Sequence, residues 1–163
     1  MAAEYSANAL QVVQPNGSVI FTESPVPCNR GLIFHRDESG LFRLASPGLM
    51  GYSCCRRCRC SDFPEALYQC AFHCNISLPE EPAGTVEPIS LAIAIDGEID
   101  PSSIMTVTVP LVSDVAGDNV GADIVAAVPC ICRCSTVSVR NVSTQAINVQ
   151  NANIVFNFAG VRR

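Results

Sequence analysis

The stretch from Cys130 to Phe158 constrains the fold most, because apolar and polar residues alternate along nearly all of it. A period of two gives a β-strand one buried side and one solvent-facing side. The breaks between the alternating runs are rich in Asn and Ser, which favour turns. We therefore predict three successive antiparallel strands. They cover residues 136–140, 147–150 and 154–158, with turns at 141–144 and 150–153.

Similar runs precede this stretch. Residues 14–17 contain Asn-Gly and predict one hairpin turn, between short strands at residues 8–13 and 18–22. Residues 37–40 predict a second, between strands at residues 31–35 and 41–44. Strand patterns follow at residues 70–78, 89–95, 104–109 and 124–128, and the second and third of these are apolar enough for central strands. About ten short strands with turns between them predict an all-β jelly-roll sandwich.

The stretch from about residue 45 to residue 69 interrupts the alternation. It is rich in cysteine, and we interpret it as a Cys-rich loop insertion with one helical turn after Pro64. The whole chain has 163 residues, which fits a single domain spanning residues 1–163.

Composition limits the classes of partner. Apolar residues make up 48% of the chain and charged residues 15%, so part of the surface is expected to lie against other subunits. The net charge of -5, without an extended basic stripe, argues against nucleic acid. No apolar stretch approaches the roughly 20 residues of a membrane-spanning helix. The first ten residues lack a basic region followed by an apolar one, so no signal peptide is expected.

Cysteine is the most unusual component, with ten residues. Cysteines two apart on a strand are separated by about 6.6 Å, whereas a disulfide needs Cβ atoms about 3.5–4.5 Å apart. The last three cysteines should therefore bond to the loop cluster 54–60 or to the pair at 70 and 74, in the same or a neighbouring subunit. The disulfide candidates are Cys28, Cys54, Cys55, Cys58, Cys60, Cys70, Cys74, Cys130, Cys132 and Cys134.

Two alternatives for the cysteines stay open. Cys55 and Cys58 together with Cys70 and Cys74 have the spacing of a structural zinc site, with His73 in reserve. Free thiols are the other alternative. Disulfides are rare in the cytosol, so a chain without an export signal would either oxidise after its cell lyses or keep its thiols reduced for metal.

The sequence offers no catalytic constellation. His35 and His73 have no orienting partner at a recognisable spacing, and no phosphate loop, nucleophile elbow or Ser/His/Asp order occurs. Asp96 and Glu98 lie in a turn-like stretch, where solvated carboxylates are usual. We therefore expect neither an enzyme nor a cofactor, with zinc as the alternative.

The run TVSVRNVSTQAINVQNANIVF, with its NxSTQAI turn, carries a family resemblance. It resembles the C-terminal strands of C1q/TNF-like jelly-roll head domains, as found in bacterial exosporium collagen-like glycoproteins and in phage fibre or capsid-decoration proteins. Residues 25–44 and 87–99 resemble the same domains. The chain departs from them in two ways: no Gly-X-Y run precedes the domain, and residues 53–74 are dense in cysteine.

The resemblance and the cysteines together imply a non-enzymatic structural protein. It would self-assemble as a trimer or larger array on the outside of a phage particle or a spore, cross-linked by disulfides after lysis. Its partners would be further copies of itself and a capsid or spore-coat protein, with neither nucleic acid nor membrane. One alternative is a carbohydrate- or receptor-binding adhesive head, and another is a zinc-binding module.

Overall fold

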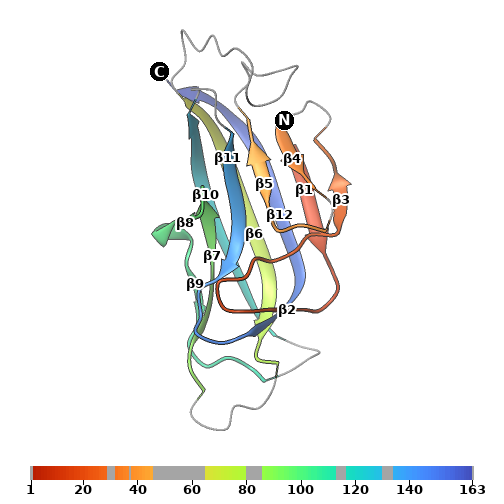
Figure 1. The fold of residues 1–163 in the computed structure, drawn as a ribbon, viewed down its shortest axis with the longest axis vertical. Coiled ribbons are helices and arrows are strands. Elements are labelled where there is room, and N and C mark those ends of the chain that lie inside the picture. Colours follow the sequence, from red (N-terminus) through yellow and green to blue (C-terminus); the bar gives the residue numbers. More distant parts are fainter. Residues whose placement is uncertain are drawn as a thin grey trace.

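Two antiparallel β-sheets face each other in a sandwich (Figure 1), as the all-β jelly-roll prediction required. The structure is a computed structural model. It describes residues 2–28, 32–36, 38–45, 65–79, 86–112, 117–129 and 134–162.

Sheet A is built around the two longest strands. β12 (Ile147–Arg162) and β6 (Glu65–Ser77) pair along most of their length, and β10 (Asp118–Pro129) extends β6 on the other side. β1 (Ala2–Ala7) and β3 (Glu23–Val26) complete the order β10-β6-β12-β1-β3. The short β2 (Gln11–Val13) also pairs with β12.

Sheet B has the order β4-β5-β11-β7-β8. Its centre is formed by β11 (Ser135–Asn141) and β7 (Ile89–Ile95), where apolar side chains are almost completely buried. The remaining strands are β4 (Ile33–His35), β5 (Phe42–Leu44), β8 (Glu98–Ile99) and β9 (Met105–Val107), of which β9 pairs with β7. A 3-10 turn, η2 (Pro101–Ser103), is capped by the Asp100 carboxylate.

An aromatic cluster fills the space between the sheets. Phe42 of sheet B packs against Tyr5 and Phe156 of sheet A, with ring centroids 4.9 Å apart in both pairs. Phe21, from the segment between β2 and β3, meets Phe42 edge-on with ring centroids 5.1 Å apart. Buried aromatic pairs of this geometry each contribute about 0.5–1.5 kcal/mol beyond their area burial. These contacts fix the two layers against each other.

The C-terminal prediction of two strands after residue 146 is wrong: a single strand, β12, runs from Ile147 to Arg162. Its pairing with β6 shifts register between Gln150 and Asn153, where Asn151 has a positive φ of 52°. This is a β-bulge, in which one extra residue is absorbed without ending the strand. Asn tolerates the left-handed conformation better than most residues and is also common in turns, which is why residues 150–153 predicted a turn. β11 and β12 also lie in different sheets rather than side by side.

The hairpin predictions are confirmed in part. β4 and β5 pair as expected around the turn at residues 37–40, and the turn at 14–17 is closed by a 2.8 Å hydrogen bond from the Gly17 amide to the Gln14 carbonyl. Residues 18–22 do not form the expected strand, since only isolated bridges from Ser18 and Phe21 occur there. β6 starts at Glu65, so residues 65–69 belong to a strand and not to the insertion. Residues 46–64 lie outside the described part of the chain.

The NxSTQAI turn is organised by Asn141, which is fully buried. Its amide Nδ2 donates to the carbonyls of Val13 and Gln145, at 2.9 and 2.8 Å, and its Oδ1 accepts from the Ser143 amide at 2.8 Å. The Asn141 backbone also exchanges hydrogen bonds with Asn16 and Gly17. One side chain thus fixes the corner at which the chain passes from sheet B to sheet A.

Candidate functional site

Two cysteine-bearing connections leave the sandwich at the same end. The segment of residues 46–64 connects β5 to β6, and residues 130–133 connect β10 to β11. Their anchoring strand ends are neighbours, because Leu44 pairs with Ser135 and Glu65 pairs with Pro129. The strand ends that flank the two cysteine clusters therefore lie close together.

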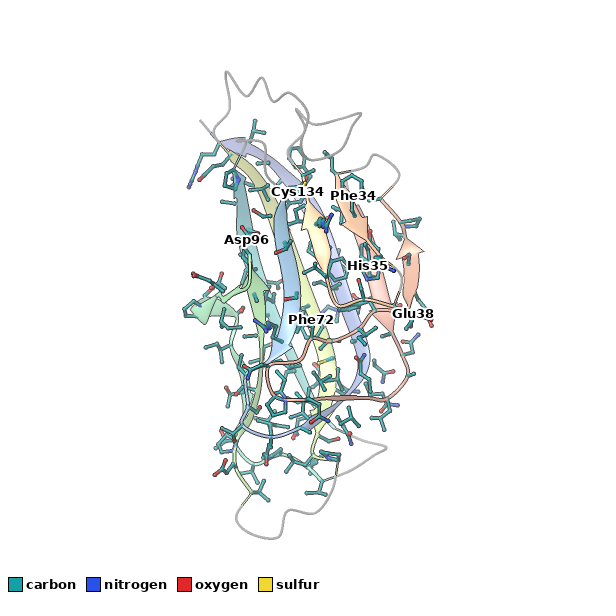
Figure 2. The ribbon with its side chains drawn as sticks, viewed as in Figure 1. Phe34, His35, Glu38, Phe72, Asp96 and Cys134 are labelled. Carbon is teal, nitrogen blue, oxygen red and sulfur yellow. The ribbon has the colours of Figure 1, made fainter. Side chains whose placement is uncertain are left out.

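Cys134 is the one member of these clusters within the described residues. It precedes β11, is disulfide-bonded, and lies toward the end of the sandwich where Figure 2 labels it. The other candidates, Cys54, Cys55, Cys58, Cys60, Cys130 and Cys132, lie outside the described residues. Cys28 is half-buried, follows β3 and packs against the core near Tyr5 and Tyr68.

Cys70 and Cys74 occupy the inner face of β6, as the alternation predicted, together with Phe72 and Ile76. Both thiols are free, so the expected bonds from these two cysteines to the C-terminal triplet are not formed. Burial raises the pKa of the Cys70 thiol from 9.0 to about 12, and burial raises the pKa of Cys74 as well. These residues act as core-filling side chains.

The proposed zinc set of Cys55, Cys58, Cys70 and Cys74 does not fit this geometry. Residues four apart on a strand are separated by about 13 Å, whereas two thiolates on one zinc lie no more than about 4.6 Å apart. The raised thiol pKa values also oppose the thiolate form that zinc requires. Within the described residues, no group of three or more His, Cys, Asp or Glu is placed to hold a metal.

The two histidines lie on different sheets. His35 stacks on Phe42 with ring centroids 4.6 Å apart, and its Nε2 lies 2.9 Å from the Ser39 carbonyl. His73 is exposed on β6, opposite Asn153 of β12 and Gly121 of β10. Asp96 closes the β7–β8 turn, where its Oδ1 accepts from the Thr136 amide at 2.7 Å. The described contacts of His35 and Asp96 are thus with the aromatic core and with turn backbone, and His73 faces solvent.

The outer face of sheet A is an open surface of the described strands. It consists of the outward residues of three adjacent long strands, β10, β6 and β12. Small, amide and branched apolar side chains predominate in it. Its members are Leu67, Gln69, Ala71, His73, Asn75, Asn119, Gly121, Asp123, Val125, Ala127, Asn153, Val155 and Asn157.

Charge is scarce at the centre of this face, where Asp123 is the one carboxylate and no arginine occurs among the members named above. At its edges, Glu65 of β6 forms an ion pair with Arg162 of β12, and Glu4 of β1 lies opposite Val155 and accepts a hydrogen bond from Asn153. Val125 is 62% exposed beside Gln69 in the pairing of β10 with β6. Charged residues are depleted at the centres of protein interfaces, so the outer face of sheet A has the composition of a contact surface.

Sequence reasoning missed this face. The alternation in residues 70–78 separated an inner from an outer set, but it did not show that the outward residues of three strands line up in one sheet. That alignment depends on the register, such as Ala71 between Asp123 and Val155, which joins parts of the chain far apart in sequence.

Comparison with known proteins supports the fold. The sequence matches no model of a protein family and no curated protein. Among solved structures, murine APRIL is similar with a TM-score of 0.57 at 8% identity, over 96% of this chain and 98% of that one. Pika GITRL gives 0.47 at 10% identity, covering 99% and 98%, and a family 35 carbohydrate binding module from Clostridium thermocellum gives 0.38 at 11%, covering 94% and 97%.

The likeness to murine APRIL shows a two-sheet β-sandwich of the TNF/C1q jelly-roll type, and at 8% identity it shows the fold alone. No helix in the described residues has the length and apolar character needed to cross a membrane.

Proposed function

We propose that this chain is a non-enzymatic structural subunit that associates with copies of itself through the outer face of sheet A. The observation that carries the proposal is the scarcity of charge at the centre of an open strand face, in a chain whose apolar fraction is 48%. An open apolar and amide-rich face of this kind is stabilised when a second copy covers it. A trimer or a larger array would satisfy this requirement.

The cysteine-rich end supplies a second element of the proposal. Both cysteine-bearing connections are rooted at one end of the sandwich, away from the centre of the outer face of sheet A. Copies that associate through that face would bring these ends into reach of one another. Disulfides between copies would then keep the assembly from dissociating on dilution. The surface of a virion or a spore, with a capsid or coat protein beneath, is the setting in which such oxidation follows lysis.

The test is to place a charge at the centre of the face. Val125→Arg and Ala71→Arg should each convert the assembly to monomers, because an unpaired charge would become buried in the interface. Val109→Arg is the matched control, since Val109 is 79% exposed and lies outside sheet A. Light scattering coupled to size exclusion measures the mass, and circular dichroism checks the fold.

The association proposal fails if the unmodified chain is a folded monomer at micromolar concentration. It also fails if Val109→Arg dissociates the assembly as effectively as Val125→Arg. The cross-linking element is tested separately by a non-reducing gel. Covalent multimers that collapse to one band with reductant support it, whereas particles whose cysteines all alkylate after denaturation without reductant exclude it.

A further inference from the structure

A groove lies on the outer side of the β4–β5 hairpin, on the sheet opposite to the proposed interface. Its volume is about 510 Å³, within the range of small-molecule sites. Because Phe34 pairs with Arg43 in register, these two side chains stand side by side on the outer face, while their neighbours Ile33 and Leu44 point into the core. Figure 2 shows Phe34 and His35 along this edge. The lining residues are Phe34, His35, Arg36, Ser39, Leu41 and Arg43.

The groove combines two arginines that form no ion pair within the described residues with two exposed apolar side chains. Phe34 is 47% exposed and Leu41 is 43% exposed. In the described part of the chain, Arg140 donates to backbone carbonyls and Arg162 pairs with Glu65. Arg36 and Arg43 make neither kind of contact, and no carboxylate of the described residues lines the groove.

The charge of the groove runs against that of the molecule. The chain carries a net charge of -5, whereas the charged side chains among the described residues that line the groove are the guanidinium groups of Arg36 and Arg43. Guanidinium groups recognise carboxylates through paired, charge-assisted hydrogen bonds. The exposed Phe34 ring supplies a flat apolar surface next to them, on which a ring can stack.

The floor of the groove is rigid. His35 is held between Phe42 and Tyr5, with ring centroids at 4.6 and 4.9 Å, and its Nε2 contacts the Ser39 carbonyl. Its Nδ1 is buried and has no hydrogen-bond partner within the described residues. A fixed floor presents the outward side chains in one arrangement, which lowers the entropic cost of binding.

We propose that this groove binds an acidic saccharide, that is, a six-membered sugar ring bearing a carboxylate. The carboxylate would lie between Arg36 and Arg43, and the apolar side of the ring would pack on Phe34 and Leu41. The proposal is independent of self-association, because the groove belongs to sheet B and the proposed interface to sheet A.

The experiment titrates the full-length chain with digalacturonate and with its dimethyl ester, which keeps the rings and removes the charge. Calorimetry or NMR shifts should give saturable binding of the acid, and binding of the ester at least about tenfold weaker, as expected for the loss of charge-assisted hydrogen bonds. Arg36→Gln and Arg43→Gln should each weaken binding of the acid at least about fivefold. Phe34→Ala should weaken the acid and the ester by similar factors.

Arg162→Gln is the matched control, since Arg162 is an exposed arginine on sheet A, and it should bind the acid as the unmodified chain does. Circular dichroism confirms that each variant is folded. Absence of saturable binding, equal binding of acid and ester, or equal loss in Arg162→Gln overturns the proposal. Tighter binding of an acidic hexapeptide or of benzoate than of digalacturonate also overturns it, by assigning the groove to another class of carboxylate.

Discussion

The outer faces of the two sheets differ in what covers them. On sheet B, Ala92 and Ala94 point away from the core cluster and are nevertheless 0% and 1% exposed. Arg140, directly opposite Ala92, reaches the carbonyls of Asn16 and Gly97 at 3.0 and 3.3 Å. On sheet A, Val125 is 62% exposed, and no described segment lies over Ala71 and Val155 to a comparable extent. At β7 the outer face of sheet B is therefore closed by its own chain, whereas the outer face of sheet A is left open.

This difference predicts which substitutions change the free energy of unfolding and which change self-association. Outward residues of β7, such as Ala92 and Ala94, contribute to the stability of a single chain, because their contacts are intramolecular. Residues on the outer face of sheet A make few contacts within the chain, so their substitution should act on assembly. The same type of substitution on the two faces should therefore have different consequences.

The largest effect is expected from arginine placed on the closed face. Ala92→Arg should destabilise the fold by about 4 kcal/mol or more, because the site has no room for the side chain and would bury an unpaired charge. Ala71→Arg should change the free energy of unfolding by less than about 1 kcal/mol, measured on the dissociated chain. Urea denaturation measures both. Equal destabilisation by the two variants would contradict the distinction between the faces.

A second prediction concerns the corner at which the chain passes between the sheets. Asn141→Ala should destabilise the fold by about 3 kcal/mol, because two carbonyls and one amide that this side chain satisfies would lose their partners. The denaturation midpoint of Asn141→Ala against that of the exposed Thr144→Ala provides the comparison. If the two variants unfold at the same urea concentration, the Asn141 network does not hold the corner.

Local patterning predicted the strands better than their partners. The apolar run of residues 89–95 correctly indicated a buried central strand, because β7 is buried on both faces. The same expectation for residues 104–109 is wrong, because β9 covers Met105–Val107 alone and pairs with β7 on one side. The outer Ala92 of β7 lies opposite Arg140, and the Arg140 guanidinium reaches the turn at residues 14–17 across 124 positions of sequence. No window of the sequence contains both. The predicted turn at residues 150–153 was wrong for the opposite reason. There the local turn preference of Asn151 is overridden by the long pairing of β12 with β6, and the chain forms a bulge instead.

The candidate sites show the same limit. Alternation placed Cys70 and Cys74 on one face of a strand, and that placement is confirmed. It could not show that the face is the apolar core, where a thiol is neither oxidised nor ionised. The groove between β4 and β5 was also hidden, because the pairing of Phe34 with Arg43 follows from the register of the hairpin and not from either residue alone.

A third prediction concerns the pH dependence of the free energy of unfolding, which the buried thiols on the inner face of β6 should affect and His73 on its outer face should not. Because burial raises the pKa of Cys70 to about 12, the folded chain keeps a proton that the unfolded chain loses above about pH 9. This contribution to stability is complete below pH 9 and declines as the pH rises toward 12, by about 1.4 kcal/mol per pH unit for each buried thiol. The measurement is the urea midpoint at pH 8, 9 and 10.

The control for the alkaline prediction is Cys70→Val with Cys74→Val, which keeps the size of the side chains and removes both thiols. Its stability should fall less steeply between pH 9 and pH 10 than that of the unmodified chain. Identical slopes would mean that the two thiols do not cause the alkaline loss. His73→Gln, on the outer face of the same strand, should leave the slope unchanged.

The smallest effect is expected from Arg140→Gln. This substitution removes hydrogen bonds to the carbonyls of Asn16 and Gly97, which are near enough to the surface for water to replace the guanidinium, so the loss should be about 1 kcal/mol. The assembled mass should not change, because Arg140 lies on sheet B. The two measurements together decide which face is shared between copies. If Arg140→Gln dissociates the assembly while the stability of the single chain is kept, the contact surface lies on sheet B, and the open face of sheet A must have another occupant.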